Sequence, residues 1–377
     1  MTTAPSTRPP DAALPLLPLV AAICLFAALL WSGSLHAVTP MLAQIASAAS
    51  EPTFYSNALS GLGLIAGGAL AHWLHRRGHR LQGFAQACGS GMWVPMLASA
   101  MLGVAVSNLL WGWTLSAGIW QPLFAPFVSV SPTIVLMFGA DIKTVLTGGV
   151  LGGVVTPPLS VLGASVLCPR LGVPSVVGVT GGMAIAAVIA FMICRHLPWV
   201  PAPALPRGPA SPPAPAVRTG PVWVLRRCVA DFSEAPFFGS EWASLGLVAG
   251  ALIAYAMAPA SVAYGSGLLP QILAAQVLTA VVAVSVWRTR WARRPFYPTF
   301  VPVVSVAPAC VLTYGGTAAS VLAGALLGAL LGPPLADRIS ALLPGDFHPF
   351  IGNVAAMAVA TAVIVPSLQL LPGITTS

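Results

Sequence analysis

The sequence predicts an all-α polytopic membrane protein with about eleven transmembrane helices, arranged as one N-terminal helix and two inverted repeats of five helices. Three observations lead to this prediction. The chain carries too few charged residues for a water-soluble fold, and its basic residues fall almost entirely on one side of the predicted helices. In addition, the second half of the chain repeats the first.

The scarcity of charge sets the class of protein. Only 6% of the 377 residues are charged and 57% are hydrophobic, with a mean hydropathy of +0.89. A soluble domain carries about 25% charged residues, so soluble enzymes, nucleic-acid binders and secreted disulfide scaffolds are excluded. The net charge of +8 does not indicate nucleic acid, because basic residues in this class mark cytoplasmic loops. We expect no cofactor and no metal, since no nucleotide, hydrolase or metalloprotease motif occurs.

Apolar runs long enough to span a membrane give the predicted elements in order. A spanning helix needs about 20 mostly apolar residues. Such runs lie at 13–34, 56–75, 90–112, 122–139, 143–166, 173–194, 242–259, 267–287, 299–315, 317–336 and 350–371. The fourth and ninth are short and contain prolines such as Pro132 and Pro308, so we expect these helices to be broken or kinked.

The basic residues predict the orientation of these helices. With the N-terminus in the cytoplasm, 15 of the 16 Lys and Arg residues lie on the cytoplasmic side, and Arg170 alone lies outside. This is a strong positive-inside signal. The composition, rich in Arg, Ala, Gly and Pro, is typical of a GC-rich prokaryote. We therefore expect a multi-pass protein of the bacterial inner membrane.

Internal similarity shows the repeats. Residues 122–139 (PLFAPFVSVSPTIVLMFG) match 298–315 (PTFVPVVSVAPACVLTYG), and 62–67 (LGLIAG) match 245–250 (LGLVAG). Each repeat holds an odd number of predicted spans, so the two copies must enter the membrane in opposite directions. Inverted repeats are typical of transporters and channels, whose solute site lies near the midplane between the repeats.

The predicted organisation has four parts. They are an N-terminal tail with the first helix (1–37), repeat 1 (38–196), a Pro-rich cytoplasmic linker (197–221) and the inverted repeat 2 (222–377). A linker of this composition is extended and has no core of its own.

Glu51 and Glu234 are the strongest candidates for the site, because the repeat places them at equivalent positions. Ionisable residues at membrane depth cost about 2.5–3.5 kcal/mol each. The same types of residue follow at the same spacing: Phe54 and Asn57 after Glu51, and Phe237 and Ser240 after Glu234. Since residues three apart share a helix face, each repeat is expected to present a carboxylate and a ring to the solute path. Alternatively, both carboxylates cap their helices in water at opposite interfaces.

Four further polar residues have two interpretations each. Asp141 and Lys143 follow the fourth span and belong either to an ordinary loop or to a gate. His348 precedes the last span and is either a proton-sensitive gate or a loop residue. Thr180 lies in the sixth span, where its hydroxyl either lines the solute path or bonds back to its own helix.

From Glu51 onward the sequence resembles the urea transporter family. In that family a Gln or Glu is followed by Phe three residues later and by an N-P-L-S-G-like stretch. Here Glu51, Phe54 and residues 57–61 (NALSG) fit this order, and Glu234 and Phe237 repeat it. The later stretches Phe138-Gly139…Val145-Leu146-Thr147-Gly148 and Tyr314-Gly315…Val321-Leu322-Ala323-Gly324 are similar to the family's Y-G-x-N…V-L-x-G, without the Asn.

The resemblance implies a trimeric, selective, channel-like protein with two inverted repeats of five spans. It implies that Glu51, Phe54, Glu234 and Phe237 bound the pore. The family's L-P-x-x-T-x-P-F signature, whose threonine helps line the path, is largely replaced around Thr180. The resemblance therefore implies a solute of the urea or amide kind without specifying urea.

We predict a channel or facilitative transporter for a small polar solute, and no enzyme. Aromatic rings would stack on a planar solute, while carboxylate or carbonyl oxygens would accept its N–H groups. One alternative is a proton- or ion-coupled secondary transporter of a small metabolite, in which Glu51 and Glu234 change protonation. Another is a membrane-embedded enzyme or a structural subunit of a complex.

Overall fold

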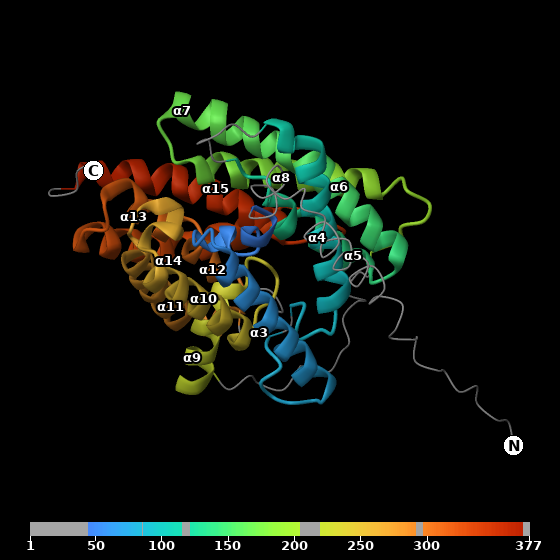
Figure 1. Cartoon of the computed structure of the whole chain (residues 1–377), viewed down its shortest axis with the longest axis horizontal. Helices are drawn as coiled ribbons and strands as arrows, with labels where there is room; N and C mark the ends of the chain where they lie inside the picture. The colour runs from blue at the N-terminus through green and yellow to red at the C-terminus, as the bar shows by residue number, and fades with distance from the viewer. Residues whose placement is uncertain (1–43, 85, 115–120, 204–218, 292–296, 372–377) are drawn as a thin grey trace, which may run out of the picture. The chain divides into compact units, whose positions relative to one another are not determined.

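The computed structural model describes residues 44–84, 86–114, 121–203, 219–291 and 297–371. Residues 41–377 form one compact unit, and the regular elements described within it are all helices (Figure 1). The described residues up to 203 are called the first half here, and those from 219 onward the second half. The predicted first span, 13–34, and the centre of the predicted linker lie outside the described residues.

The two halves contain helices of similar kinds in the same order. The first half has η1 (Glu51–Thr53), α3 (Ala58–Arg76), α4 (Trp93–Trp111), η3 (Ala125–Val128), α5 (Val130–Phe138), α6 (Ile142–Leu162), η4 (Gly163–Leu167), α7 (Cys168–Leu171) and α8 (Ser175–Cys194). The second half has α9 (Pro221–Ala230), η5 (Asp231–Ser233), α10 (Glu241–Met257), η7 (Ala263–Gly265), α11 (Leu269–Trp291), α12 (Phe300–Val303), α13 (Val306–Tyr314), α14 (Ala318–Ala341) and α15 (Phe350–Ser367).

Six helices in the described residues are long and apolar enough to cross a membrane. They are Trp93–Trp111, Ile142–Leu171, Ser175–Cys194, Leu269–Arg290, Ala318–Ala341 and Phe350–Leu370. These correspond to the third, fifth, sixth, eighth, tenth and eleventh predicted spans. The second is α3, and the fourth, seventh and ninth are the shorter apolar helices Ala125–Phe138, Glu241–Met257 and Phe300–Tyr314. The helical, membrane-type fold is therefore confirmed, whereas the count of eleven spans stays a prediction.

The fourth and ninth predicted spans are both interrupted in the middle. Ser129 and Ser305 leave helical geometry, with φ/ψ of −134°/−111° and −139°/−79°. Each hydroxyl donates to the carbonyl four residues earlier, at 2.6 Å to Ala125 and 2.7 Å to Val301. Nearby prolines remove backbone donors, and hydroxyl groups of this kind satisfy the carbonyls that are left over. Both interrupted helices are buried, so irregular backbone is kept away from lipid.

Glycines bring α3 and α10 into direct backbone contact. A Cβ on Gly63 would lie 2.0 Å from the carbonyl oxygen of Gly246, and a Cβ on Gly246 would lie 2.1 Å from that of Gly63. The neighbouring contacts are equally reciprocal: Gly67 meets Trp242, and Gly250 meets Leu59. Small residues permit this approach between membrane helices. The glycines belong to the matched stretches LGLIAG and LGLVAG, so α3 and α10 cross at equivalent points.

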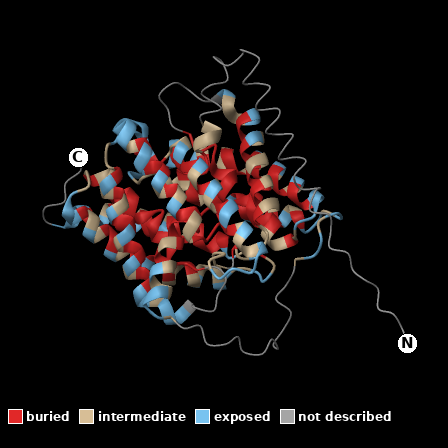
Figure 2. Cartoon of the chain, turned by 60° about the horizontal axis from the view of Figure 1, so that its bottom comes forward, coloured by how far each residue is buried: buried red, intermediate tan, exposed pale blue. Residues whose placement is uncertain are grey.

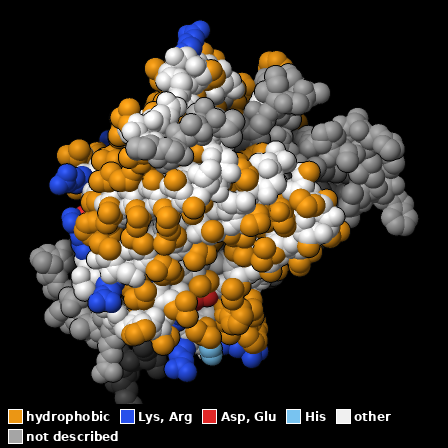
Figure 3. Space-filling model, turned by 90° about the vertical axis from the view of Figure 1, so that its left-hand side faces the viewer, with side chains coloured by type: hydrophobic (Ala, Val, Ile, Leu, Met, Phe, Trp, Pro, Cys, Tyr) orange, Lys and Arg blue, Asp and Glu red, His pale blue; other side chains and the backbone are white. Residues whose placement is uncertain are grey.

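The surface of the described part carries large apolar side chains. Buried residues fill the interior, and exposed residues lie on the outer faces of the helices (Figure 2). On α14, for example, Leu322, Leu326 and Leu330 are exposed at a spacing of four residues. Figure 3 shows hydrophobic side chains covering the middle of one face, with Lys and Arg toward its edges. An apolar band bordered by basic residues is what a membrane-spanning protein presents to lipid and headgroups.

Candidate functional site

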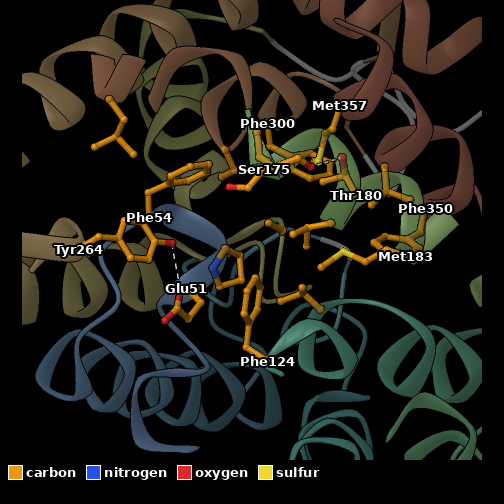
Figure 4. Close-up of a pocket in the computed structure, with 18 residues that line it drawn as sticks. Glu51, Phe54, Phe124, Ser175, Thr180, Met183, Tyr264, Phe300, Phe350 and Met357 are labelled. Carbon is orange, nitrogen blue, oxygen red and sulfur yellow. Dashed lines mark hydrogen bonds between the residues drawn. The ribbon is translucent and has the colours of Figure 1, made fainter. Parts of the chain in front are cut away.

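A cavity of about 260 Å³ lies where elements of the two halves meet (Figure 4). Its walls come from η1, η3 and α8 of the first half and from η7, α12, α13 and α15 of the second. Helices α8 and α15 pack against each other (Figure 1). One water molecule occupies about 30 Å³ of the liquid, so the cavity has room for a solute of several heavy atoms.

Many lining residues are matched pairs, one from each half. Phe124 and Phe300 hold the same place in the matched stretches 122–139 and 298–315. Met183 of α8 and Met357 of α15 form another such pair. Further pairs at the same offsets are Val128 with Val304, and Val176 with Phe350. The cavity therefore lies at the junction of the two matched halves.

The carboxylate of Glu51 forms one end of this cavity. Glu51 as a whole is 6% exposed, and its carboxylate accepts hydrogen bonds from two hydroxyl groups. Ser56 Oγ donates to Oε1 at 2.5 Å, and the phenol of Tyr264 donates to Oε2 at 2.9 Å. The rings of Phe54 and Tyr264 form a T-shaped contact, with their centroids 6.3 Å apart. Figure 4 shows Glu51, Phe54 and Tyr264 grouped at one side of the cavity.

A serine clamp holds the turn that carries each glutamate. Ser50 Oγ accepts the N–H of Asn57 at 2.9 Å and donates to its carbonyl at 2.8 Å. Ser233 Oγ makes the same two bonds to Ser240, at 3.0 and 2.9 Å. Both clamps span seven residues and enclose the glutamate and its phenylalanine. The two sites therefore share one local fold.

Each turn also holds its phenylalanine in a left-handed conformation. Phe54 has φ of 68° and Phe237 has φ of 65°. For a bulky residue this region is an outlier that costs roughly 1–3 kcal/mol. In both turns the phenylalanine N–H donates to the glutamate carbonyl at 2.9 Å. Strain of this kind clusters at functional sites, and here it occurs twice at equivalent positions.

Glu234 lies in a buried ion cluster and not among the lining residues of the cavity. The Nη2 atom of Arg227 is 3.0 Å from Oε2 of Glu234 and 2.7 Å from Oδ1 of Asp231. All three side chains are at most 1% exposed. The hydroxyl of Thr299 also donates to Asp231, at 3.1 Å. The guanidinium lies over two rings, 4.9 Å from the centroid of Phe84 and 4.8 Å from that of Tyr297. This carboxylate is therefore paired with a cation within the protein, which it shares with Asp231.

Phe237 packs behind the wall of the cavity. It is fully buried, and its ring centroid is 5.3 Å from that of Phe350, which lines the cavity, and 6.0 Å from that of His348. Loss of surrounding water lowers the pKa of His348 to about 4, so its ring is neutral at pH 7. Its Nδ1 accepts the N–H of Phe350 at 3.1 Å. Phe350 therefore lines the cavity, and Phe237 packs behind it.

The other predicted site residues have local roles in the helices. Thr180 lines the cavity, and its hydroxyl donates to the carbonyl of Val176 at 2.7 Å. Asn57 caps α3 by accepting the N–H of Leu59 at 2.9 Å, and Ser240 is the first residue before α10. Asp141 caps α6, where it accepts the N–H of Lys143 at 3.1 Å. Of the seven predicted residues, the cavity thus gathers Glu51, Phe54 and Thr180.

Several residues of the site did not emerge from the sequence. Phe124 and Phe300, like Met183 and Met357, lay in matched stretches, so their pairing was a usable signal. Tyr264 gave no signal, because it comes from the loop between α10 and α11 and approaches Glu51 only in the folded chain.

No known family model matches this chain, and no curated protein matches it. Among the described residues, no three His, Cys, Asp or Glu side chains gather to hold a metal ion. The function is therefore argued from the cavity itself.

Proposed function

We propose that the protein is a channel or facilitative transporter of the bacterial inner membrane that passes a small polar solute of the urea or amide kind. One observation carries the proposal. The cavity is lined by matched residues from both halves, and it combines four phenylalanine rings with the carboxylate of Glu51. A mostly apolar cavity with a few placed polar groups is typical of small-molecule sites. In transporters built from repeats, such sites lie between the repeats.

We further propose that the two halves are inverted repeats of five spans, preceded by the predicted first span. Support comes from the reciprocal glycine crossing of α3 and α10 and from the two serine clamps. With the N-terminus in the cytoplasm, the Glu51 end faces outward and the Glu234 end faces inward. The resemblance to the urea transporter family supports the same arrangement and a trimeric assembly.

A proton-coupled transporter is the second candidate. The specific observation in its favour is Glu51, a carboxylate at 6% exposure on the wall of the cavity. Carboxylates in such positions form proton relays in coupled transporters. Uptake that rises with an imposed proton gradient would support coupling, whereas uptake that follows only the solute gradient would support the facilitative path.

The proposal is tested by closing the cavity. In proteoliposomes, the protein should take up radiolabelled urea or acetamide faster than protein-free liposomes do. Met183→Trp fills the cavity from α8 and should reduce uptake to the protein-free level. Ile185→Trp is the matched control, since Ile185 lies on the same helix but is 55% exposed, and it should keep its uptake. If Met183→Trp transports normally, or if the unaltered protein transports neither solute, the proposal is wrong.

A further inference from the structure

Three hydroxyl groups in or beside the cavity donate their hydrogens to the protein, those of the exposed Tyr264, the partly buried Ser56 and the buried Thr180. Tyr264 and Ser56 both donate to Glu51, and Thr180 donates to the carbonyl of Val176. Their oxygens retain lone pairs, and an ionised carboxylate has only acceptors. Ser175 is the lining hydroxyl outside this pattern, and it is exposed. Glu51 and Thr180, the buried polar side chains of the lining, therefore offer a solute hydrogen-bond acceptors.

The remaining wall favours positive charge. Phe54, Phe124, Phe300 and Phe350 line the cavity, together with the thioethers of Met183 and Met357. The faces of aromatic rings attract cations such as ammonium and guanidinium groups, most strongly where water is excluded. Among the described residues of the lining, Glu51 is acidic and none is Lys, Arg or His. Glu51 is thus the acidic side chain that the described lining presents to a cation.

From these two features we infer that the cavity selects a small, planar, N–H-rich organic cation of the guanidinium or amidinium class over neutral amides. Urea and guanidinium have nearly the same size and plane, but urea replaces one donor-bearing nitrogen by an acceptor oxygen. A buried acceptor that finds no donor costs about 1–3 kcal/mol. Guanidinium instead presents N–H donors alone, and it pairs with a carboxylate through two parallel hydrogen bonds. The inference rests on the proposed function and names the solute class for the same cavity.

The Glu234 end is compatible with a cationic solute. Its cluster contains two acidic groups, Asp231 and Glu234, and one basic group, Arg227. The acidic groups of this cluster therefore outnumber its basic group. A cation leaving the cavity in that direction meets no net positive charge in this cluster.

The test compares the two isosteres on the full-length protein. Uptake of radiolabelled guanidinium, urea and acetamide into proteoliposomes is measured, and each unlabelled solute competes with the others. We expect guanidinium to inhibit acetamide uptake at a concentration at least about tenfold lower than urea does. In Glu51→Gln this advantage should disappear. Glu241→Gln is the matched control, because Glu241 pairs with Arg226 away from the cavity, and it should keep the advantage.

The outcomes separate this inference from the proposed function. If urea and acetamide enter but guanidinium neither enters nor competes better than urea, the cation inference is overturned. The proposed transport of a small polar solute is then still supported. If guanidinium competes equally well in Glu51→Gln, the assignment to this carboxylate is overturned. If none of the three solutes crosses faster than in protein-free liposomes, both fail. Saturable guanidinium uptake without amide uptake supports the cation inference and overturns the proposed passage of urea or amides.

Discussion

Glu51 and Glu234 occupy turns with the same serine clamp and the same left-handed phenylalanine, yet their surroundings differ. Glu51 accepts hydrogen bonds from Ser56 and Tyr264 and lines the cavity. Glu234 instead pairs with Arg227 and is fully buried. The same local fold therefore places a carboxylate in each half. The residues packed around each carboxylate decide whether it lines the cavity.

Two substitutions between the halves account for the difference. In the register that pairs Glu51 with Glu234, the residue matching Arg227 is Gln44, so the first half has no cation at that position. On the cavity wall, Phe350 stands where α8 has the smaller Val176. Phe350 packs against Phe237, three residues after Glu234, with the rings tilted by 50°. A shared framework with unequal side chains thus gives a Glu51 end whose carboxylate lines the cavity, called the open end, and a Glu234 end whose carboxylate does not, called the closed end.

The largest expected effect is the loss of the buried cation at the closed end. Arg227→Met leaves two buried acidic groups without their partner, and breaking a buried ion pair in this way costs about 3–5 kcal/mol of stability. We expect a clear fall in the thermal unfolding temperature of the purified protein in detergent. Arg226→Met, on the same helix, removes a half-buried cation paired with Glu241, and it should cost much less.

A double variant tests whether the uncompensated charge causes the loss of stability in Arg227→Met. Adding Glu234→Gln removes one of the uncompensated charges, so the double variant should be more stable than Arg227→Met alone. If the double variant is less stable, or if Arg226→Met and Arg227→Met unfold at the same temperature, the ion cluster does not stabilise the closed end.

Exchanging the two wall residues should produce a smaller change, seen in transport. Phe350→Val gives the closed end the side chain of the open end, at a cost of about 1–3 kcal/mol for the lost packing. We expect faster uptake of the transported solute into proteoliposomes. Val176→Phe makes the reverse change and should slow uptake. If both variants transport at the rate of the unaltered protein, these residues do not set the difference between the ends.

Much of the fold followed from composition and periodicity, because membrane helices are long, apolar and locally hydrogen-bonded. Six predicted spans correspond to helices that could cross a membrane, and the proline-containing fourth and ninth are interrupted as predicted. The matching of Glu51 with Glu234 corresponds to turns of the same geometry. The sequence similarity between the halves predicted this shared turn, because both copies contain the same kinds of residue at the same spacing.

The differences between the ends could not be predicted in the same way. Tyr264 reaches Glu51 across 213 residues of sequence, and no local pattern marks such a contact. Arg227 was counted as one of the basic residues of the cytoplasmic side, although it is 1% exposed and pairs with Asp231 and Glu234. Charge counts give the side of the membrane but not the partner of each charge. The pairing depends on how α9 and η5 pack against the rest of the unit.

The smallest expected effect concerns the surface beside the closed end. Asp346, in the loop before α15, forms a two-point ion pair with Arg195 at the end of α8, with both N···O distances 2.7 Å. The hydrogen bonds from Arg195 hold the pKa of Asp346 below its ordinary value of 3.8. Because the folded-state pKa is the lower one, the pair stabilises the fold fully above that ordinary value. The contribution is lost as the pH falls through the folded-state pKa.

Comparing the unaltered protein with Asp346→Asn isolates this contribution. The difference in unfolding temperature should be constant and small between pH 5 and 7, since a half-exposed pair is screened by solvent. It should shrink once the pH falls below about 4, where the carboxylate starts to take up its proton. A difference that grows on acidification would mean that the pair does not stabilise the loop. Because the loop carries His348 and leads into Phe350, that result would also remove one support for the closed end.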